Sequence, residues 1–138
     1  MNYGTWGSII TMKILVVHRQ NNTVDQIKSV LSSCNPVVRY AESGLDGLLT
    51  SRIEHFDVII CGTDLPVVTG LELARSIRTN SINRNSPVVL LSDEVDEKIR
   101  QLGKSLGGTT LLARKDLDVQ LAGIVHNQVA TESNKNLD

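Results

Sequence analysis

Three polar side chains in this sequence are of the types that could hold an oxyanion. Arg19, Ser92 and Arg114 each follow closely on a short apolar run. Guanidinium groups donate charge-assisted hydrogen bonds, and a serine hydroxyl can add another. Asp64 and Asp93 also follow apolar runs and could neutralise the two arginines, since a buried charge needs a partner. The residues predict either two structural ion pairs, which we favour, or an anion site.

His18 is the other side chain that could act chemically, as a general base. No nucleophile or orienting partner can be identified beside it in the sequence. The stretch 18–23 contains no glycine, so it lacks the backbone cradle of a P-loop or dinucleotide turn. We also find no nucleophile elbow and no catalytic carboxylate pair. The sequence therefore predicts a protein that is not an enzyme, with no cofactor and no metal.

The composition is that of an ordinary globular domain. The chain has 138 residues, of which 41% are hydrophobic, 21% charged and 3% aromatic, and its net charge is −1. Such a charge balance favours neither nucleic acid nor an anionic membrane, and the scarcity of aromatic residues argues against a flavin or base-stacking pocket. Cys34 and Cys61 lack metal-ligand spacing and fit a reducing cytosol. We expect a cytoplasmic protein with neither nucleic-acid nor membrane partners.

Short apolar runs alternate with amphipathic stretches along the chain. Five runs are expected to form buried strands, at 14–17, 37–38, 58–61, 88–91 and 111–113. Strands that alternate with helices imply right-handed βαβ units with helices on both faces of a sheet. We predict an α/β, flavodoxin-like (βα)5 three-layer sandwich, with a five-stranded parallel sheet of order 2-1-3-4-5. The domain is expected at 12–130, between a leader at 1–11 and a polar tail at 131–138.

Each expected helix has an apolar face that should pack on the sheet. These faces are Val24, Ile27, Val30 and Leu31; Leu45, Leu48, Leu49 and Ile53; Leu71, Ala74 and Ile77; Val95, Ile99, Leu102 and Leu106; and Leu117, Leu121, Ile124 and Val125. Two pairs, Thr23 with Gln26 and Thr69 with Glu72, have the spacing of a capping box. Ser43 is expected to cap the second helix.

Three segments resemble response-regulator receiver domains. The strongest is 57–73, DVIICGTDLPVVTGLEL, in which an apolar strand, Leu-Pro and Gly-Leu-Glu-Leu stand in register. The segment 87–92, PVVLLS, resembles the fourth strand of that family, and 106–115, LGGTTLLARK, resembles the fifth strand and its approach. The resemblance covers about 12–129, in the family's order and spacing. It implies the fold predicted above and a role in signal transduction.

The resemblance also indicates that the family's carboxylates are missing here. In receivers, an aspartate four residues before the proline accepts a phosphoryl group, and the matching residue is Gly62. Two acidic residues after the first strand usually bind Mg²⁺, which prefers oxygen ligands; the matching residues are His18 and Arg19. Imidazole is a poor Mg²⁺ ligand, and a guanidinium group would repel the ion. We therefore predict a degenerate phosphorylation pocket without a metal.

The remaining family positions are partly retained. Ser92 matches the hydroxyl of the family's switch, although it could equally be a helix cap, and Arg114 matches the family lysine. Leu111 stands at the aromatic switch position, and Lys115 replaces the usual proline. The expected pocket thus comprises His18, Arg19, Gly62, Asp64, Ser92 and Arg114.

The resemblance implies an atypical receiver, or pseudo-receiver, that signals by protein contact rather than by aspartyl phosphorylation. Receivers use the face made by their fourth helix, fifth strand and fifth helix to contact partners. Five residues are expected to lie on that face here: Asp96, Glu97, Arg100, Gln101 and Lys104. A protein partner from a signalling pathway is expected.

Three other interpretations stay open. The chain could be a small-molecule or anion-binding module on a flavodoxin-like fold, with the anion beside Arg19 and Arg114. It could be a receiver phosphorylated at Asp64, two residues past the usual position. It could also be the receiver half of a transcription factor, but no basic recognition helix follows the fifth helix, so we expect no DNA binding.

Overall fold

A computed structural model of the protein describes residues 12–137, so the leader expected at 1–11 lies outside the described residues. Strands and helices alternate along these residues. The strands are β1 Lys13–Val17, β2 Val37–Ala41, β3 Val58–Gly62, β4 Val88–Ser92 and β5 Thr109–Ala113. The helices are α2 Asn21–Val30, α3 Gly44–Ile53, α4 Gly70–Asn80, α5 Glu97–Lys104 and α6 Leu117–Leu137, with 3-10 turns at Ser32–Cys34 and Arg114–Asp116.

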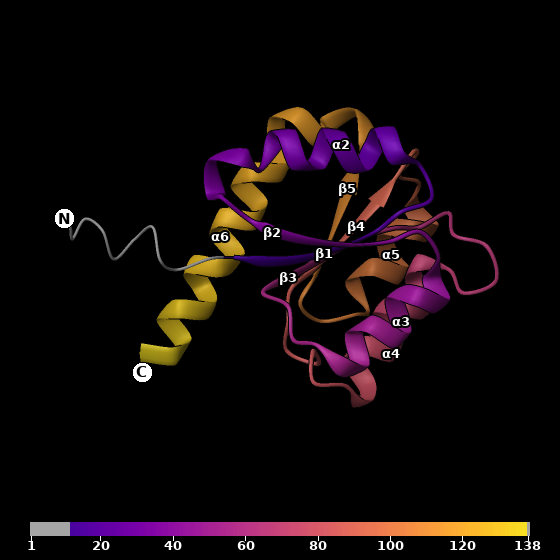
Figure 1. The fold of residues 1–138 in the computed structure, drawn as a ribbon. Coiled ribbons are helices and arrows are strands. Elements are labelled where there is room, and N and C mark those ends of the chain that lie inside the picture. The colour runs from indigo at the N-terminus through magenta and orange to yellow at the C-terminus, as the bar shows by residue number, and fades with distance from the viewer. Residues whose placement is uncertain (1–11, 138) are drawn as a thin grey trace.

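The strands form one parallel sheet of order β2-β1-β3-β4-β5, which confirms the predicted flavodoxin-like topology (Figure 1). In the centre, Leu15 of β1 lies opposite Arg39 of β2 and Ile59 of β3. Beside the edge strand β5, Ser92 of β4 pairs with Ala113. Because the strands are parallel, their carboxyl ends meet at one edge of the sheet, which is where this topology places ligand sites.

Two apolar cores lie on opposite faces of the sheet. Figure 1 shows α2 and α6 over one face and α3, α4 and α5 over the other. The first core joins strand residues to α2 and α6. Its helical members are Val24, Ile27, Leu117, Leu121 and Val125, and Leu31, directly after α2, also belongs to it. The second core joins the other strand face to α4, through Leu73, Ala74 and Ile77. The helical faces predicted for α2, α4 and α6 are therefore confirmed.

The face predicted for α3 is largely wrong, since of its four residues only Leu48 packs, half-buried, against the second core. Leu45, Leu49 and Ile53 are 53%, 50% and 81% exposed, and the helix buries Gly44, Gly47 and Ser51 instead. A β-carbon on Gly47 would lie only 2.7 Å from a methyl carbon of Val17 in β1. The helix approaches the sheet so closely that only small residues fit between them, and most of its leucines and isoleucine face outward as a result.

The predicted helix starts are correct for two helices and wrong for one. The hydroxyl of Ser43 caps α3, and Thr69 with Glu72 forms the expected capping box on α4. Thr23 does not cap α2, because the helix begins at Asn21 after Gln20, and Thr23 is fully buried inside it. The sequence patterns identified caps that depend on neighbours three residues apart, but not the point at which α2 begins.

The last helix is longer than expected. We predicted a polar tail from residue 131, but α6 continues to Leu137 without a break. Among the described residues, no helix is both long and apolar enough to cross a membrane.

Candidate functional site

The residues predicted to form a pocket gather at the carboxyl ends of four strands. His18 follows β1, Gly62 ends β3, Ser92 ends β4, and Arg114 follows β5. A cavity of about 20 Å³ lies here, lined by His18, Arg19, Gln20, Gly62, Thr63, Asp64, Leu91 and Asp93. That volume is close to the minimum that a single water molecule needs. Ser92 and Arg114 lie near this cavity but do not line it.

The ring of His18 fills the space beside Gly62. A β-carbon on Gly62 would lie 2.9 Å from Cδ2 and 3.2 Å from Nε2 of His18. Contacts this short between carbon atoms are repulsive, because attraction is greatest near 3.5–4.0 Å. The imidazole therefore lies where a side chain on residue 62 would point. Because the ring fills this space, the remaining cavity is small.

Hydrogen bonding indicates that His18 is neutral. The backbone N–H of Gln20 donates to Nδ1 of His18 over 3.1 Å, so Nδ1 is an acceptor and the proton lies on Nε2. Burial of the imidazole is the main cause that lowers the pKa of His18, and the nearby charge of Arg114 lowers it further. A neutral imidazole beside two guanidinium groups avoids adding a third positive charge to the site.

Arg19 makes an ion pair at the surface. Its Nη2 lies 2.7 Å from Oδ2 of Asp64, and the two side chains are 51% and 74% exposed. The pairing agrees with the ion-pair interpretation of the sequence, but the guanidinium group is not buried. Exposed pairs of this kind contribute about 0.2–1 kcal/mol to stability. The pair therefore neutralises charge locally and does little to hold the fold.

Arg114 has two partners, one of which the sequence did not indicate. Its Nη1 donates to Oε1 of Gln20 over 2.8 Å and lies 3.5 Å from Oδ1 of Asp93. Gln20 and Arg114 are 94 residues apart, and a neutral glutamine in a loop has no pattern that would predict this bond. Gln20 links the site together, because its backbone N–H also holds the ring of His18.

The hydroxyl of Ser92 turns away from the arginines. It donates to the backbone oxygen of Glu94 over 2.6 Å, and the residue is 4% exposed. The alternative role of Ser92, as a helix cap, is wrong. Asp96 caps α5 instead, by accepting a hydrogen bond from the N–H of Ile99. Ser92 thus lies at the expected edge of the sheet, but its hydroxyl donates its hydrogen bond to the backbone of the turn after β4.

A family model of the response regulator receiver domain matches residues 14–122. The chain belongs to this family. Among curated relatives, the transcriptional regulatory protein CusR of Escherichia coli K12 is 30% identical over 103 residues, which are 75% of this chain and 44% of CusR. The cyclic di-GMP phosphodiesterase response regulator RpfG of Xanthomonas campestris is 25% identical over 95% of this chain and 38% of its own length. The receiver domain thus spans less than half the length of these relatives.

Solved structures agree with this assignment. Chemotaxis protein CheY4 of Vibrio cholerae has a TM-score of 0.77 at 25% identity, covering 86% of this chain and 98% of that one. The receiver domain of the sensor histidine kinase PA1611 from Pseudomonas aeruginosa, which holds a magnesium ion in its active site cleft, has a TM-score of 0.78 at 21% identity. It covers 88% of this chain and 99% of its own, and at this identity the likeness shows the fold alone.

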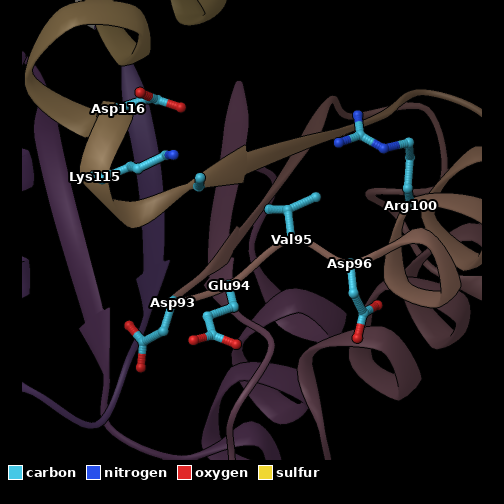
Figure 2. Close-up of a pocket in the computed structure, with 8 residues that line it drawn as sticks. Asp93, Glu94, Val95, Asp96, Arg100, Lys115 and Asp116 are labelled. Carbon is cyan, nitrogen blue, oxygen red and sulfur yellow. The ribbon is translucent and has the colours of Figure 1, made fainter.

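A groove of about 540 Å³ lies beside the pocket of this receiver domain, between the start of α5 and the end of β5 (Figure 2). Its lining residues are Asp93, Glu94, Val95, Asp96, Arg100, Ala113, Lys115 and Asp116. Of the five residues expected to contact partners, Asp96 and Arg100 line this groove, whereas Glu97, Gln101 and Lys104 are exposed on α5 outside it. Asp93 lines both the groove and the small cavity.

The charges around the groove extend to different sides. In Figure 2 the side chains of Lys115 and Arg100 extend toward each other on one side of Val95, and the carboxylates of Asp93 and Glu94 extend to the other. Leu111, the residue expected at the family's aromatic switch position, is half-buried and packs against the second core. It does not line the groove.

Proposed function

We propose that this receiver domain signals through contact with a partner protein and does not accept a phosphoryl group. The observation that carries the proposal is the ring of His18, which occupies the space that an acceptor side chain at Gly62 would need. The adjoining cavity of about 20 Å³ has no room for a phosphoryl group with a hydrated ion. Within the described residues, no three His, Cys, Asp or Glu side chains gather as a metal site would require.

Phosphorylation at Asp64 and anion binding are the competing proposals for the same pocket. Asp64 is 74% exposed and held by Arg19, so a phosphoryl group on it would lie in solvent, away from buried groups that could respond to it. An anion between Arg19 and Arg114 would have to displace Asp64 and Asp93, which already neutralise those arginines. The ion-pair arrangement is the one that the geometry supports best.

The partner is proposed to bind at the groove beside α5 and β5. Receiver domains interact with other signalling proteins, and this groove is the large concave surface next to the degenerate pocket. Arg100 and Lys115 on one side and Val95 in the middle combine charged and apolar contacts, as interfaces do. Such a domain is proposed to present one fixed surface in the cytoplasm, without catalysis of its own.

Intact-mass spectrometry after incubation with acetyl phosphate and Mg²⁺ tests the first half of the proposal. We expect no phosphoryl adduct on the wild type or on Gly62→Asp, because one carboxylate beside Arg19 does not assemble a metal site. A receiver that retains the acceptor aspartate serves as the positive control. A stoichiometric adduct on the wild type, mapped to Asp64 or elsewhere, would overturn the proposal.

Partner capture tests the second half. Proteins retained from the native host by the immobilised domain should be the same with and without acetyl phosphate and Mg²⁺. Replacing Arg100 and Lys115 together with glutamate should abolish the capture, whereas Lys98→Glu, elsewhere on α5, should not. Capture that depends on the phosphodonor, or that survives the double substitution, would contradict the assignment.

A further inference from the structure

We propose a second binding site at the amino end of the sheet, between the end of α3 and the turn before β4, that takes an acidic peptide segment of a partner protein. A cavity of about 390 Å³ lies here, lined by Arg52, Ser81, Ile82 and Arg84. No carboxylate lines it. The site lies before β3 and β4 in the chain, at the opposite edge of the sheet from His18 and Gly62. It is independent of the proposed partner groove.

The two arginines of this site have no carboxylate partner among the side chains that the structure describes. Arg19, Arg39 and Arg114 each have a carboxylate oxygen within 3.5 Å, but Arg52 and Arg84 make neither an ion pair nor a side-chain hydrogen bond there. Guanidinium groups match the geometry of carboxylates and bind them with paired hydrogen bonds. Two unpaired guanidinium groups on one cavity therefore complement an acidic ligand.

A buried polar network fixes the backbones that carry these arginines. Asn83, which is fully buried, donates to the backbone oxygens of Ser51 and Glu54 over 2.6 and 2.9 Å, and accepts from the N–H of Phe56 over 2.8 Å. Ser51 and Glu54 flank Arg52 in the chain, and Asn83 precedes Arg84. One side chain thus ties together the two segments of the site, which reduces the ordering cost of binding.

Arg78 of α4 also holds this turn in place by a hydrogen bond. Nη1 of Arg78 donates to the backbone oxygen of Arg84 over 2.9 Å, which holds the turn against α4. The hydroxyl of Ser81 is already committed, since it donates to the backbone oxygen of Ile77 and accepts from the N–H of Asn83. The ligand contacts in the cavity are therefore left to Arg52, Arg84 and the apolar surface of Ile82.

Exposed apolar surface favours a peptide over a small anion. Ile82, which lines the cavity, is 52% exposed, and Ile53, next to Arg52, is 81% exposed. Protein interfaces are enriched in arginine, and the buried centre of an interface is more apolar than the rest of the protein surface. A position in the last turn of α3 would suit Arg52 alone, because a cation there complements the helix dipole. That effect does not explain Arg84, which lies in a turn.

Binding of a defined probe tests the site. The acetylated hexapeptide Glu-Leu-Glu-Glu-Leu-Glu is titrated into the isotope-labelled domain and followed by amide NMR shifts, with the analogue in which every Glu is Gln as its control. We expect shifts at 51–54 and 81–86 for the acidic probe, weakening with salt, and none for the neutral analogue. No shifts, equal shifts from both peptides, or shifts confined to the groove beside α5 would overturn the proposal.

Substitutions complete the test. The variant with Arg52→Gln and Arg84→Gln should bind the acidic probe at least about tenfold more weakly, the loss expected when interface arginines are removed. Lys98→Gln, which removes one of the same charges from α5, should leave binding unchanged. Undiminished binding by the double variant would overturn the site, and stronger binding of inorganic phosphate than of the peptide would overturn the peptide as its ligand. Neither result would bear on phosphoryl uptake or on the groove.

Discussion

The imidazole of His18 lies beside Gly62 across the carboxyl ends of β1 and β3, so closely that a β-carbon added to residue 62 would lie 2.9 Å from Cδ2 of the ring. These two positions are separate in sequence, yet each restricts what the other can be. We propose that these positions correspond to a metal ligand and the phosphoryl acceptor of the receiver family. Here residue 62 is a glycine, and the ring of His18 fills the space beside it.

Gly62→Ala should destabilise the domain by about 1–3 kcal/mol, because a methyl group in this well-filled space overpacks it. The cost should fall when His18→Ala is present as well, which gives a coupling free energy of at least about 1 kcal/mol in a double-mutant cycle. Urea unfolding of the four proteins measures it. An equal cost of Gly62→Ala in both backgrounds would show that the ring does not restrict residue 62.

Stability should rise with pH up to about 6.5 and then level off, owing to His18. Its folded pKa is lowered from 6.5, so between the folded value and 6.5 the unfolded chain binds more protons, and stability is lost as pH falls through that window. Four nearby charges also act on the pKa of His18: Arg114 and Arg19 lower it, and Asp93 and Asp64 raise it. His18→Gln should flatten the rise of stability with pH, measured as urea unfolding midpoints across the window. His55→Gln should not. A slope that persists in His18→Gln would assign it to another group.

The bond between Gln20 and Arg114 should contribute more to stability than the exposed pair of Arg19 and Asp64. Gln20→Ala should cost about 1 kcal/mol, since it removes a part-buried hydrogen bond to a charged group. Arg19→Ala should cost less than about 1 kcal/mol, because its side chain and that of Asp64 are largely exposed. Chemical denaturation of both variants gives the comparison, and a larger loss for Arg19→Ala would contradict it.

Two glycines in helices should respond in opposite ways to alanine. Gly47→Ala should destabilise by about 1–3 kcal/mol, because the new β-carbon would lie 2.7 Å from a methyl carbon of Val17. Gly123→Ala in α6 should stabilise by about 0.5–1 kcal/mol, since a β-carbon added there would meet no atom within 4 Å outside the adjacent helix backbone. Thermal or urea unfolding distinguishes the two. Stabilisation by Gly47→Ala would mean that α3 does not lie as close to β1 as we describe.

Much of the fold is readable in the sequence because its signals are local. The five apolar runs became five strands, since β-branched residues in near-continuous runs suit a parallel sheet covered on both faces. Ser43, and Thr69 with Glu72, could be identified as caps because these hydrogen bonds join residues three apart. That residue 62 carries no carboxylate is plain from the sequence, but its importance rests on the resemblance of the neighbouring motif to receiver domains.

Tertiary structure decided which of these residues meet and how. The outward turn of Leu45 and Leu49 follows from the close approach of α3 to β1, which no pattern within α3 reports. The bond from Arg114 to Gln20 spans 94 residues, and the hydroxyl of Ser92 turned to the next loop although its type suited the pocket. Sequence periodicity records what a helix or strand does along its own length. Where a ring such as that of His18 finally lies depends on the space that distant strands leave, and that space exists only after they have packed.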